Sequence, residues 1–308
     1  MSSPIYGVVP PVITPLTSER RFDEESNERN ITRMIDAGVH GLFVLGSSGE
    51  VAFTTDADRE RILASAVSIA AGRLPVLAGV IDTQTPRVLE HVAAAERLGA
   101  DGIVATAPFY ALGGVDQVEE HFRAIRRATD LPIYAYDIPV CVNGVKLQPA
   151  MLLRLAADGV IQGVKDSSGD DVSFRFLTLA NRTAEKKLAL LTGHEVVVDG
   201  AYMSGADGAV PGLGNIDPAA YVRQWNAYRA GDWETVRAEQ DRLADLMTIV
   251  TAAQGLTGFG AGVGAFKTAL ALLGVIATNE MPAPVRALAG AEVDTIAAIL
   301  ERNGLPVA

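Results

Sequence analysis

Lys165 stands where a short apolar stretch ends near the middle of the chain. Val160, Ile161 and Val164 have the spacing and residue types of a buried strand, and Asp166–Gly169 is typical of a loop that leads into a helix. Desolvation of a lysine amine favours its neutral form, which is the form that attacks a ketone to give a Schiff base. The alternative is that the Lys165 side chain extends from the strand end to solvent.

Two other apolar stretches also end in residues that could do chemistry. The turn Gly46–Glu50 could hold a carboxylate with its backbone N–H groups and the hydroxyls of Ser47 and Ser48, or could serve only to reverse the chain. Strand alternation places Tyr134 and Tyr136 on the same side, where a tyrosine either carries protons or is a half-buried aromatic. An anion cradle, a proton carrier and an amine are the minimum set for a Schiff-base lyase that acts on a 2-oxo acid.

These three segments belong to a regular alternation of short apolar and amphipathic stretches, which is typical of βα units around a parallel sheet. The helix-to-strand junctions 37–41, 98–102 and 204–208 share a Gly-x-x-Gly pattern, and glycine suits a left-handed helix cap. Eight such units in 308 residues favour a (β/α)8 TIM barrel, which needs about 250 residues, over an open sheet. The expected strands are Gly7–Ile13, Gly41–Leu45, Pro75–Val80, Gly102–Ala107, Pro132–Tyr136, Val160–Lys165, Leu188–Leu191 and Gly208–Gly212.

After about residue 230 the expected strands stop, and residues 231–254, 263–273 and 284–302 have the patterns of helices. We therefore expect a barrel over residues 1–230 and a C-terminal helical extension over residues 231–308 that packs on it, with a glycine-rich joint at 255–264. Lys267 lies among these helices rather than at a strand end, so we interpret it as a structural lysine.

Composition excludes several classes of function. The formal net charge of −11 disfavours binding to nucleic acid or to an anionic membrane surface, because both need a basic face. No apolar stretch reaches the roughly 18 residues of a membrane helix. The single cysteine, Cys141, and the absence of a signal-peptide pattern predict a reducing, cytoplasmic location. The four histidines are scattered without ligand spacing, so we expect no metal and no other cofactor.

Four motifs, in the same order and at similar spacing, resemble the signatures of the dihydrodipicolinate synthase / N-acetylneuraminate lyase family of class I pyruvate-dependent aldolases. They are Gly7–Pro15, Gly46–Glu50, Tyr136–Pro139 and Gly163–Asp166, and the resemblance extends from about residue 5 through the C-terminal helices. It implies an active site at the carboxyl ends of the barrel strands, a small-molecule substrate, and a homotetramer built as a dimer of dimers.

The resemblance implies a Schiff-base mechanism. Lys165 would attack the ketone of pyruvate, or of a pyruvate-containing adduct, to give an imine that acts as an electron sink. Tyr136 would carry protons to and from the substrate, and Ser47, Ser48 and the backbone of their loop, including Gly49, would hold the carboxylate. The reaction would make or break a carbon–carbon bond between pyruvate and an aldehyde, as in 2-oxo sugar acids; the alternative is dehydration of such a sugar acid.

Further positions would surround this centre. Tyr110 matches a tyrosine that in some family members reaches the proton relay of a neighbouring subunit, and Val210 would line the pocket with its backbone. Glu195 and His194 fall where sugar-acid members place polar groups for the distal chain, although His194 also fits a surface loop. True dihydrodipicolinate synthases have an arginine shortly after the Tyr-x-x-Pro motif. That position is Cys141 here, and a neutral thiol cannot replace a guanidinium, which disfavours 4-hydroxy-tetrahydrodipicolinate synthase activity.

Two questions stay open at the level of sequence. A non-catalytic metabolite-binding member of the family is an alternative, which the joint presence of Lys165 and Tyr136 disfavours. Asp137 stands beside Tyr136, where asparagine is common in the family, and the sequence alone does not explain its effect.

Overall fold

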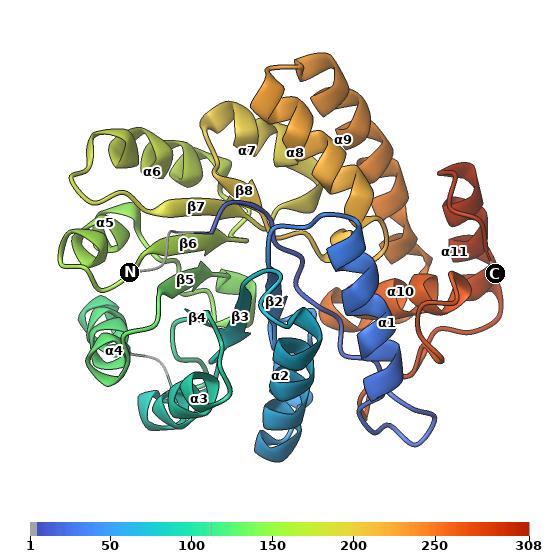
Figure 1. Ribbon diagram of the computed structural model, residues 1–308, viewed down its shortest axis with the longest axis horizontal. Helices are drawn as coiled ribbons and strands as arrows, with labels where there is room; N and C mark the ends of the chain where they lie inside the picture. The colour runs from blue at the N-terminus through green and yellow to red at the C-terminus, as the bar shows by residue number, and fades with distance from the viewer. Residues whose placement is uncertain (1–4, 112, 308) are drawn as a thin grey trace.

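The protein is described by a computed structural model over residues 5–111 and 113–307, and its centre is a sheet of eight parallel strands in the order β1-β8-β7-β6-β5-β4-β3-β2 (Figure 1). The segment after β1 closes the sheet onto β2, because Val12 N–H donates to Phe43 O (2.8 Å) and Phe43 N–H donates to Pro10 O (3.0 Å). The expected (β/α)8 barrel is therefore confirmed. The strands are β1 (Gly7–Val8), β2 (Leu42–Val44), β3 (Val76–Gly79), β4 (Gly102–Ala105), β5 (Ile133–Asp137), β6 (Gly163–Asp166), β7 (Ala189–Thr192) and β8 (Gly208–Ala209).

Helices α1 to α8 follow the strands and surround the sheet in Figure 1. Polar side chains cap the first turns of α1 and α2. Asp23 accepts the N–H of Ser26 in α1, and Thr55 accepts the N–H of Asp58 in α2. No helix in the described part of the chain is both long and apolar enough to cross a bilayer. The helices are α1 (Glu24–Asp36), α2 (Asp56–Ala70), α3 (Thr85–Arg97), α4 (Val115–Ala128), α5 (Pro149–Ala157), α6 (Asp171–Thr183), α7 (Val198–Ser204) and α8 (Pro218–Ala230).

The repeated Gly-x-x-Gly junctions have the conformation that their pattern predicts. Gly38, Gly99 and Gly205 have φ values of 84°, 83° and 99°, which lie in the left-handed region where a residue with a Cβ is strained. Each of these glycines follows a helix and turns the chain toward the next strand, where buried residues such as Leu42 on β2 and Ile103 on β4 join one continuous apolar core. The junctions thus set the direction in which each strand enters the barrel.

Most strand boundaries differ from the expectation by one to five residues, and two of the larger differences have a clear local cause. β6 begins at Gly163 rather than at Val160, because Gly159 has a φ of 75° and the N–H of Val160 donates to the last turn of α5. β1 ends at residue 8, because two prolines follow that have no N–H to donate to a neighbouring strand. Neither change moves Lys165, which remains near the carboxyl end of its strand.

The C-terminal helices lie on one side of the barrel and are orange to red in Figure 1. The prediction of a glycine-rich joint at 255–264 is wrong for residues 258–264, because α10 begins at Gly258 and continues through the later glycines. A Cβ added at Gly260 would lie 3.3 Å from Val285, so a small residue there lets the segment before α11 pack closely. The helix expected at 284–302 begins only at Ala291. The three helices are α9 (Trp233–Met247), α10 (Gly258–Leu272) and α11 (Ala291–Arg302).

Candidate active site

The amine of Lys165 lies in the barrel against two aromatic rings. Its Nζ is 4.0 Å from the centroid of the Tyr136 ring and 4.9 Å from that of Phe43, and the residue is only 5% exposed, so the alternative of a solvent-directed lysine is wrong. Lys146 and Lys267 each pair with a buried carboxylate, whereas Lys165 has no ion-pair partner among the described residues. Cation–π contacts therefore hold the Lys165 amine, which has no carboxylate partner among the described residues.

Strand pairing brings the three chemically informative strand ends together. Tyr136 on β5 lies opposite Lys165 on β6 in the register of the sheet. The hydroxyl of Tyr136 is 3.5 Å from Oγ of Ser47, in the loop that follows β2. Ser47 and Ser48 are both partly exposed, while Tyr136 is 3% exposed. An amine, a phenol and a hydroxyl thus share one end of the barrel.

The loop that carries the two serines has an unusual backbone. Leu45 and Glu50 both have positive φ values, 61° and 59°, which few side chains tolerate without support. Thr14 supplies support by donating its hydroxyl to Gly49 O at 2.8 Å. A Cβ at Gly49 would lie 3.1 Å from Val12 O, so glycine lets the loop approach the first strand segment closely. The loop is therefore fixed by the barrel around it before any substrate binds.

A buried ion pair joins this loop to the C-terminal helices. Nζ of Lys267, on α10, donates to Glu50 Oε2 at 2.5 Å and to Glu280 O at 3.0 Å, and Lys267 is fully buried. Burial raises the pKa of Glu50 to about 6, although the charge and hydrogen bond of Lys267 act in the opposite direction. Burial likewise lowers the pKa of Lys267, and its attraction to Glu50 offsets only part of this effect. Lys267 therefore holds the end of the Gly46–Glu50 loop in place from α10, outside the barrel.

Glu195 lies near the site, but its carboxylate already has a partner. It stands in the 3-10 helix η3 (Glu195–Val197), and Leu213 N–H donates to its Oε2 at 2.5 Å. Burial raises its pKa to about 7, although the N–H groups of Leu213 and Gly212 and the charge of Lys165 favour the ionised form. The protonation of Glu195 therefore changes close to neutral pH.

The other expected site residues occupy different positions. Tyr110 is 88% exposed, so within one chain it does not join the buried cluster around Lys165. Val210 is buried at the end of β8. His194 is partly exposed, with Nδ1 3.5 Å from Asp171 Oδ1. Cys141 is an exposed residue, but desolvation by neighbouring atoms raises the pKa of its thiol, against a hydrogen bond with Ser47 and the charge of Lys165, so the thiol is neutral at neutral pH.

A cavity of about 100 Å³ lies beside Ser47 and has mostly apolar walls. Ser47, whose Oγ is 3.5 Å from the hydroxyl of Tyr136, lines this cavity, so it offers space for a substrate substituent or for a side chain of another molecule. Its lining includes Ser47, Ile81, Thr106, Phe109, Cys141 and Phe259.

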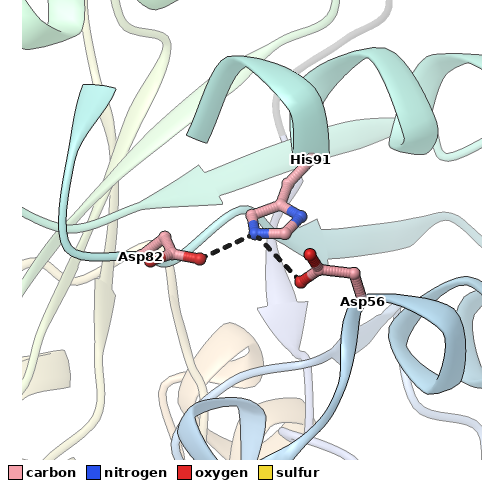
Figure 2. Close-up of side chains that lie close together, drawn as sticks. All are labelled: Asp56, Asp82 and His91. Carbon is pink, nitrogen blue, oxygen red and sulfur yellow. Dashed lines mark hydrogen bonds and ion pairs between the residues drawn. The ribbon is translucent and has the colours of Figure 1, made fainter. Parts of the chain in front are cut away.

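Asp56, Asp82 and His91 converge between α2, α3 and the end of β3, as Figure 2 shows. His91 Nε2 is 2.9 Å from Asp82 Oδ2 and 4.0 Å from Asp56 Oδ1. Arg87 Nε lies 3.0 Å from the same Asp82 oxygen, and Arg59 contacts His91 at 2.7 Å. Burial raises the pKa of Asp82, but hydrogen bonds from Arg87, His91 and a backbone N–H outweigh it and hold the pKa well below its usual value. Arginine already balances these carboxylates, so we assign the cluster to structure rather than to a metal.

Sequence reasoning missed two residues beside Lys165. Phe43 forms the second aromatic wall, and its place on β2 with alternate residues facing inward was the available signal. Gly193 follows β7, and a Cβ there would lie 2.0 Å from Ser167 Oγ and 3.1 Å from Lys165 Cε. Glycine at this position therefore makes room for the side chains of Ser167 and Lys165, which is a property that only the folded structure reveals.

A barrel with a free amine, a tyrosine and a serine loop at one end agrees with the four motifs of the sequence. The profile of the Dihydrodipicolinate synthetase family matches residues 4–303. The chain belongs to this family. The expected family is thereby confirmed, and the chain is a lyase or aldolase of the dihydrodipicolinate synthetase family.

Relatives of the chain cover most of its length. An uncharacterized DapA-like lyase of Halobacterium salinarum is 35% identical over 268 residues, which are 84% of this chain and 86% of the relative. The dihydrodipicolinate synthase structure from Bacteroides thetaiotaomicron has a TM-score of 0.91 at 31% identity and covers 98% of this chain and 100% of its own. A prophage protein of the dihydrodipicolinic acid synthase family from E. coli K12, solved in complex with pyruvate, has a TM-score of 0.91 at 26% identity and covers 97% of this chain and 99% of its own.

Proposed function

We propose that the protein is a Schiff-base lyase or aldolase that makes or breaks the carbon–carbon bond between pyruvate and an aldehyde, as in a 2-oxo sugar acid or a similar hydroxy-oxo acid. The observation that carries the proposal is the buried amine of Lys165, which lies over the Tyr136 ring without a carboxylate partner among the described residues. The related prophage protein solved with pyruvate supports the choice of 2-oxo acid.

Each step follows from groups at the site. Nζ of Lys165 adds to the ketone carbon, water leaves, and a protonated imine forms. When the bond to the hydroxyl-bearing carbon breaks, its electron pair passes to the imine, which becomes an enamine, and the hydroxyl loses its proton as the aldehyde forms. Protonation of the enamine carbon and hydrolysis of the resulting imine then release pyruvate and return the amine. The reverse sequence condenses pyruvate with the aldehyde.

Tyr136 is the proton carrier in this scheme, because its ring lies 4.0 Å from the amine and its hydroxyl lies 3.5 Å from Ser47 Oγ. Ser47, Ser48 and the N–H groups of their loop bind the substrate carboxylate, and the fixed backbone of that loop means that little ordering is needed on binding. The neutral thiol of Cys141 lies beside Ser47, where it cannot form an ion pair with a second carboxylate. This favours an aldehyde substrate that is uncharged near Cys141.

We also propose that copies of the chain assemble, as the family resemblance predicts, and that Tyr110 contributes to the site of a neighbouring copy. Tyr110 is 88% exposed, and a cavity lies beside Ser47 in each chain. Sedimentation velocity tests the assembly: a tetramer or dimer supports it, and a monomer whose Tyr110→Phe variant has unchanged turnover contradicts it.

The experiment that tests the activity uses a panel of 4-hydroxy-2-oxo acids, with released pyruvate measured by coupling to lactate dehydrogenase. We expect turnover by the wild type and none by Lys165→Ala. The Lys186→Met variant is a matched control, because Lys186 is exposed on the outside of the barrel. Substrate binding without turnover in both the wild type and Lys165→Ala would support a metabolite-binding protein instead.

A further inference from the structure

Two carboxylates lie directly behind the residues that carry the proposed chemistry. Asp137 follows Tyr136 on β5, Asp166 follows Lys165 on β6, and the two aspartates are paired across the strands. Successive side chains of a strand point to opposite faces, so both carboxylates point away from the face that holds the amine. Asp137 is fully buried and Asp166 is 7% exposed. Like charges at opposed positions in a sheet repel each other, so this pair requires a cation.

Lys146 supplies the cation from the segment between β5 and α5. Its Nζ donates to Asp137 Oδ2 and lies 3.9 Å from Asp166 Oδ2. The next residue, Leu147, donates its N–H to Asp137 Oδ1 at 3.0 Å, so both oxygens of Asp137 have partners. The three charged groups carry one net negative charge, and the side chain of Lys146 is 18% exposed. The ammonium thus bridges two buried strand ends rather than extending to solvent.

The same aspartates also order the backbone around the site. The carbonyl of Asp137 accepts the N–H of Ser167 at 2.9 Å, and the carbonyl of Asp166 accepts the N–H of Gly193 at 2.7 Å. Gly193 is the residue whose missing Cβ makes room for Lys165. A shift of either aspartate would therefore displace the ends of β5, β6 and β7 together.

We propose that Lys146 is a positioning residue for the Schiff-base chemistry: its ammonium holds Asp137 and Asp166 together and thereby sets the spacing between Tyr136 and Lys165. The inference rests on the proposed function of Lys165. It also explains why an aspartate stands beside the tyrosine, since a mostly buried ammonium requires a charged partner and an asparagine at 137 would leave it only the more distant Asp166.

The first test replaces Lys146 with methionine, which keeps most of the side-chain volume and removes the charge. We expect kcat for cleavage of a 4-hydroxy-2-oxo acid to fall about 10- to 100-fold, because a displacement of about 1 Å between reacting groups has effects of this size. We expect KM to change less than about two-fold, because Lys146 has no hydrogen bond or ion pair with the Gly46–Glu50 loop in the described part of the chain. Lys186→Met is the matched control and should leave both constants unchanged.

Two more variants separate charge from packing. Lys146→Arg keeps the charge and should retain more activity than Lys146→Met. Asp137→Asn combined with Lys146→Met removes both members of the buried pair, so we expect its kcat to exceed that of Lys146→Met by at least about five-fold. If Lys146→Met does not fold, this double variant and Lys146→Arg provide the comparison. A kcat for Lys146→Met equal to the wild type, or a loss of thermal stability alone, would overturn the proposal.

Failure of the proposed function is distinguishable from failure of the inference. Wild-type protein that forms no pyruvate adduct on Lys165 removes the Schiff-base function. Hydrogen exchange at the Leu147 amide, which does not depend on activity, reports the contact itself. We expect faster exchange in Lys146→Met than in the wild type, and slower exchange in the double variant than in Lys146→Met. Equal exchange in the wild type and Lys146→Met would overturn the role of Lys146.

Discussion

Lys267→Met should destabilise the protein strongly above neutral pH and weakly in mild acid. The change leaves the Glu50 carboxylate, which is 3% exposed, without its ammonium partner at 2.5 Å. Removal of one member of a buried ion pair costs about 3–5 kcal/mol, because the remaining charge is uncompensated. The carboxyl avoids this cost only by binding a proton, so the loss of stability must depend on pH.

The sign of that dependence follows from the pKa of Glu50, which burial raises from 4.5 to about 6. A raised pKa in the folded state gives a stabilising contribution that is fully present below pH 4.5 and is lost as the pH rises through about 6. A pKa difference of one corresponds to about 1.4 kcal/mol, so this contribution is about 2 kcal/mol in the wild type. Lys267 lowers the pKa of Glu50, so its removal extends the loss to higher pH. The two proteins therefore diverge as the pH rises.

The assay is urea-induced unfolding, followed by circular dichroism, at about pH 5 and about pH 8. Lys186→Met controls for loss of a lysine. The double variant Glu50→Gln/Lys267→Met has no charge in the pair, so its free energy of unfolding at the higher pH should exceed that of Lys267→Met. The expected pH dependence is wrong if the free energy of unfolding of Lys267→Met differs from that of the wild type by the same amount at both pH values. A difference below about 1 kcal/mol at both would also contradict the role of a buried pair, because that size is typical of exposed pairs.

Three further changes probe the site itself. Tyr136→Phe should lower kcat about 10²- to 10⁴-fold, measured with a 4-hydroxy-2-oxo acid, because it removes the proton carrier; a smaller loss would assign proton transfer to another group. Ser47→Ala should raise KM for the 2-oxo acid about ten-fold through loss of a hydrogen bond to its carboxylate, and an unchanged KM would place that carboxylate elsewhere. Gly193→Ala places a methyl group 3.1 Å from Cε of Lys165 and should slow imine formation, measured by rapid-quench borohydride trapping, about ten-fold or more. Gly200→Ala, where an added Cβ meets nothing within 4 Å, is its control and should trap at the wild-type rate.

The fold and the centre of the site could be predicted because they depend on local patterns. Apolar stretches at regular intervals indicate parallel strands, and a barrel brings the carboxyl ends of all its strands to one face. Lys165, Tyr136 and Ser47 each stand at such an end, so their proximity follows from the topology alone. The motif resemblance adds the chemistry that these residue types perform together.

Contacts between distant segments could not be predicted in this way. Glu50 and Lys267 are 217 residues apart, and only the packing of α10 on the barrel brings them together. The N–H of Leu213, which donates to the carboxylate of Glu195, belongs to a residue 18 positions later in the chain. The sequence does not show that the carboxylate of Asp137 has a partner, because the ammonium of Lys146 reaches it only in the folded chain. Each of these contacts depends on how distant segments pack in the folded chain, and the local periodicity of the sequence does not predict that packing.

The proposed activity depends on a covalent imine between Lys165 and pyruvate. The most direct measurement is borohydride reduction of the wild-type protein with pyruvate present and absent, followed by intact-protein and peptide mass spectrometry. We predict one reduced pyruvate adduct per chain, located on the peptide that contains Lys165, and none in Lys165→Ala. No adduct, or an adduct on Lys267 instead, would contradict the Schiff-base assignment.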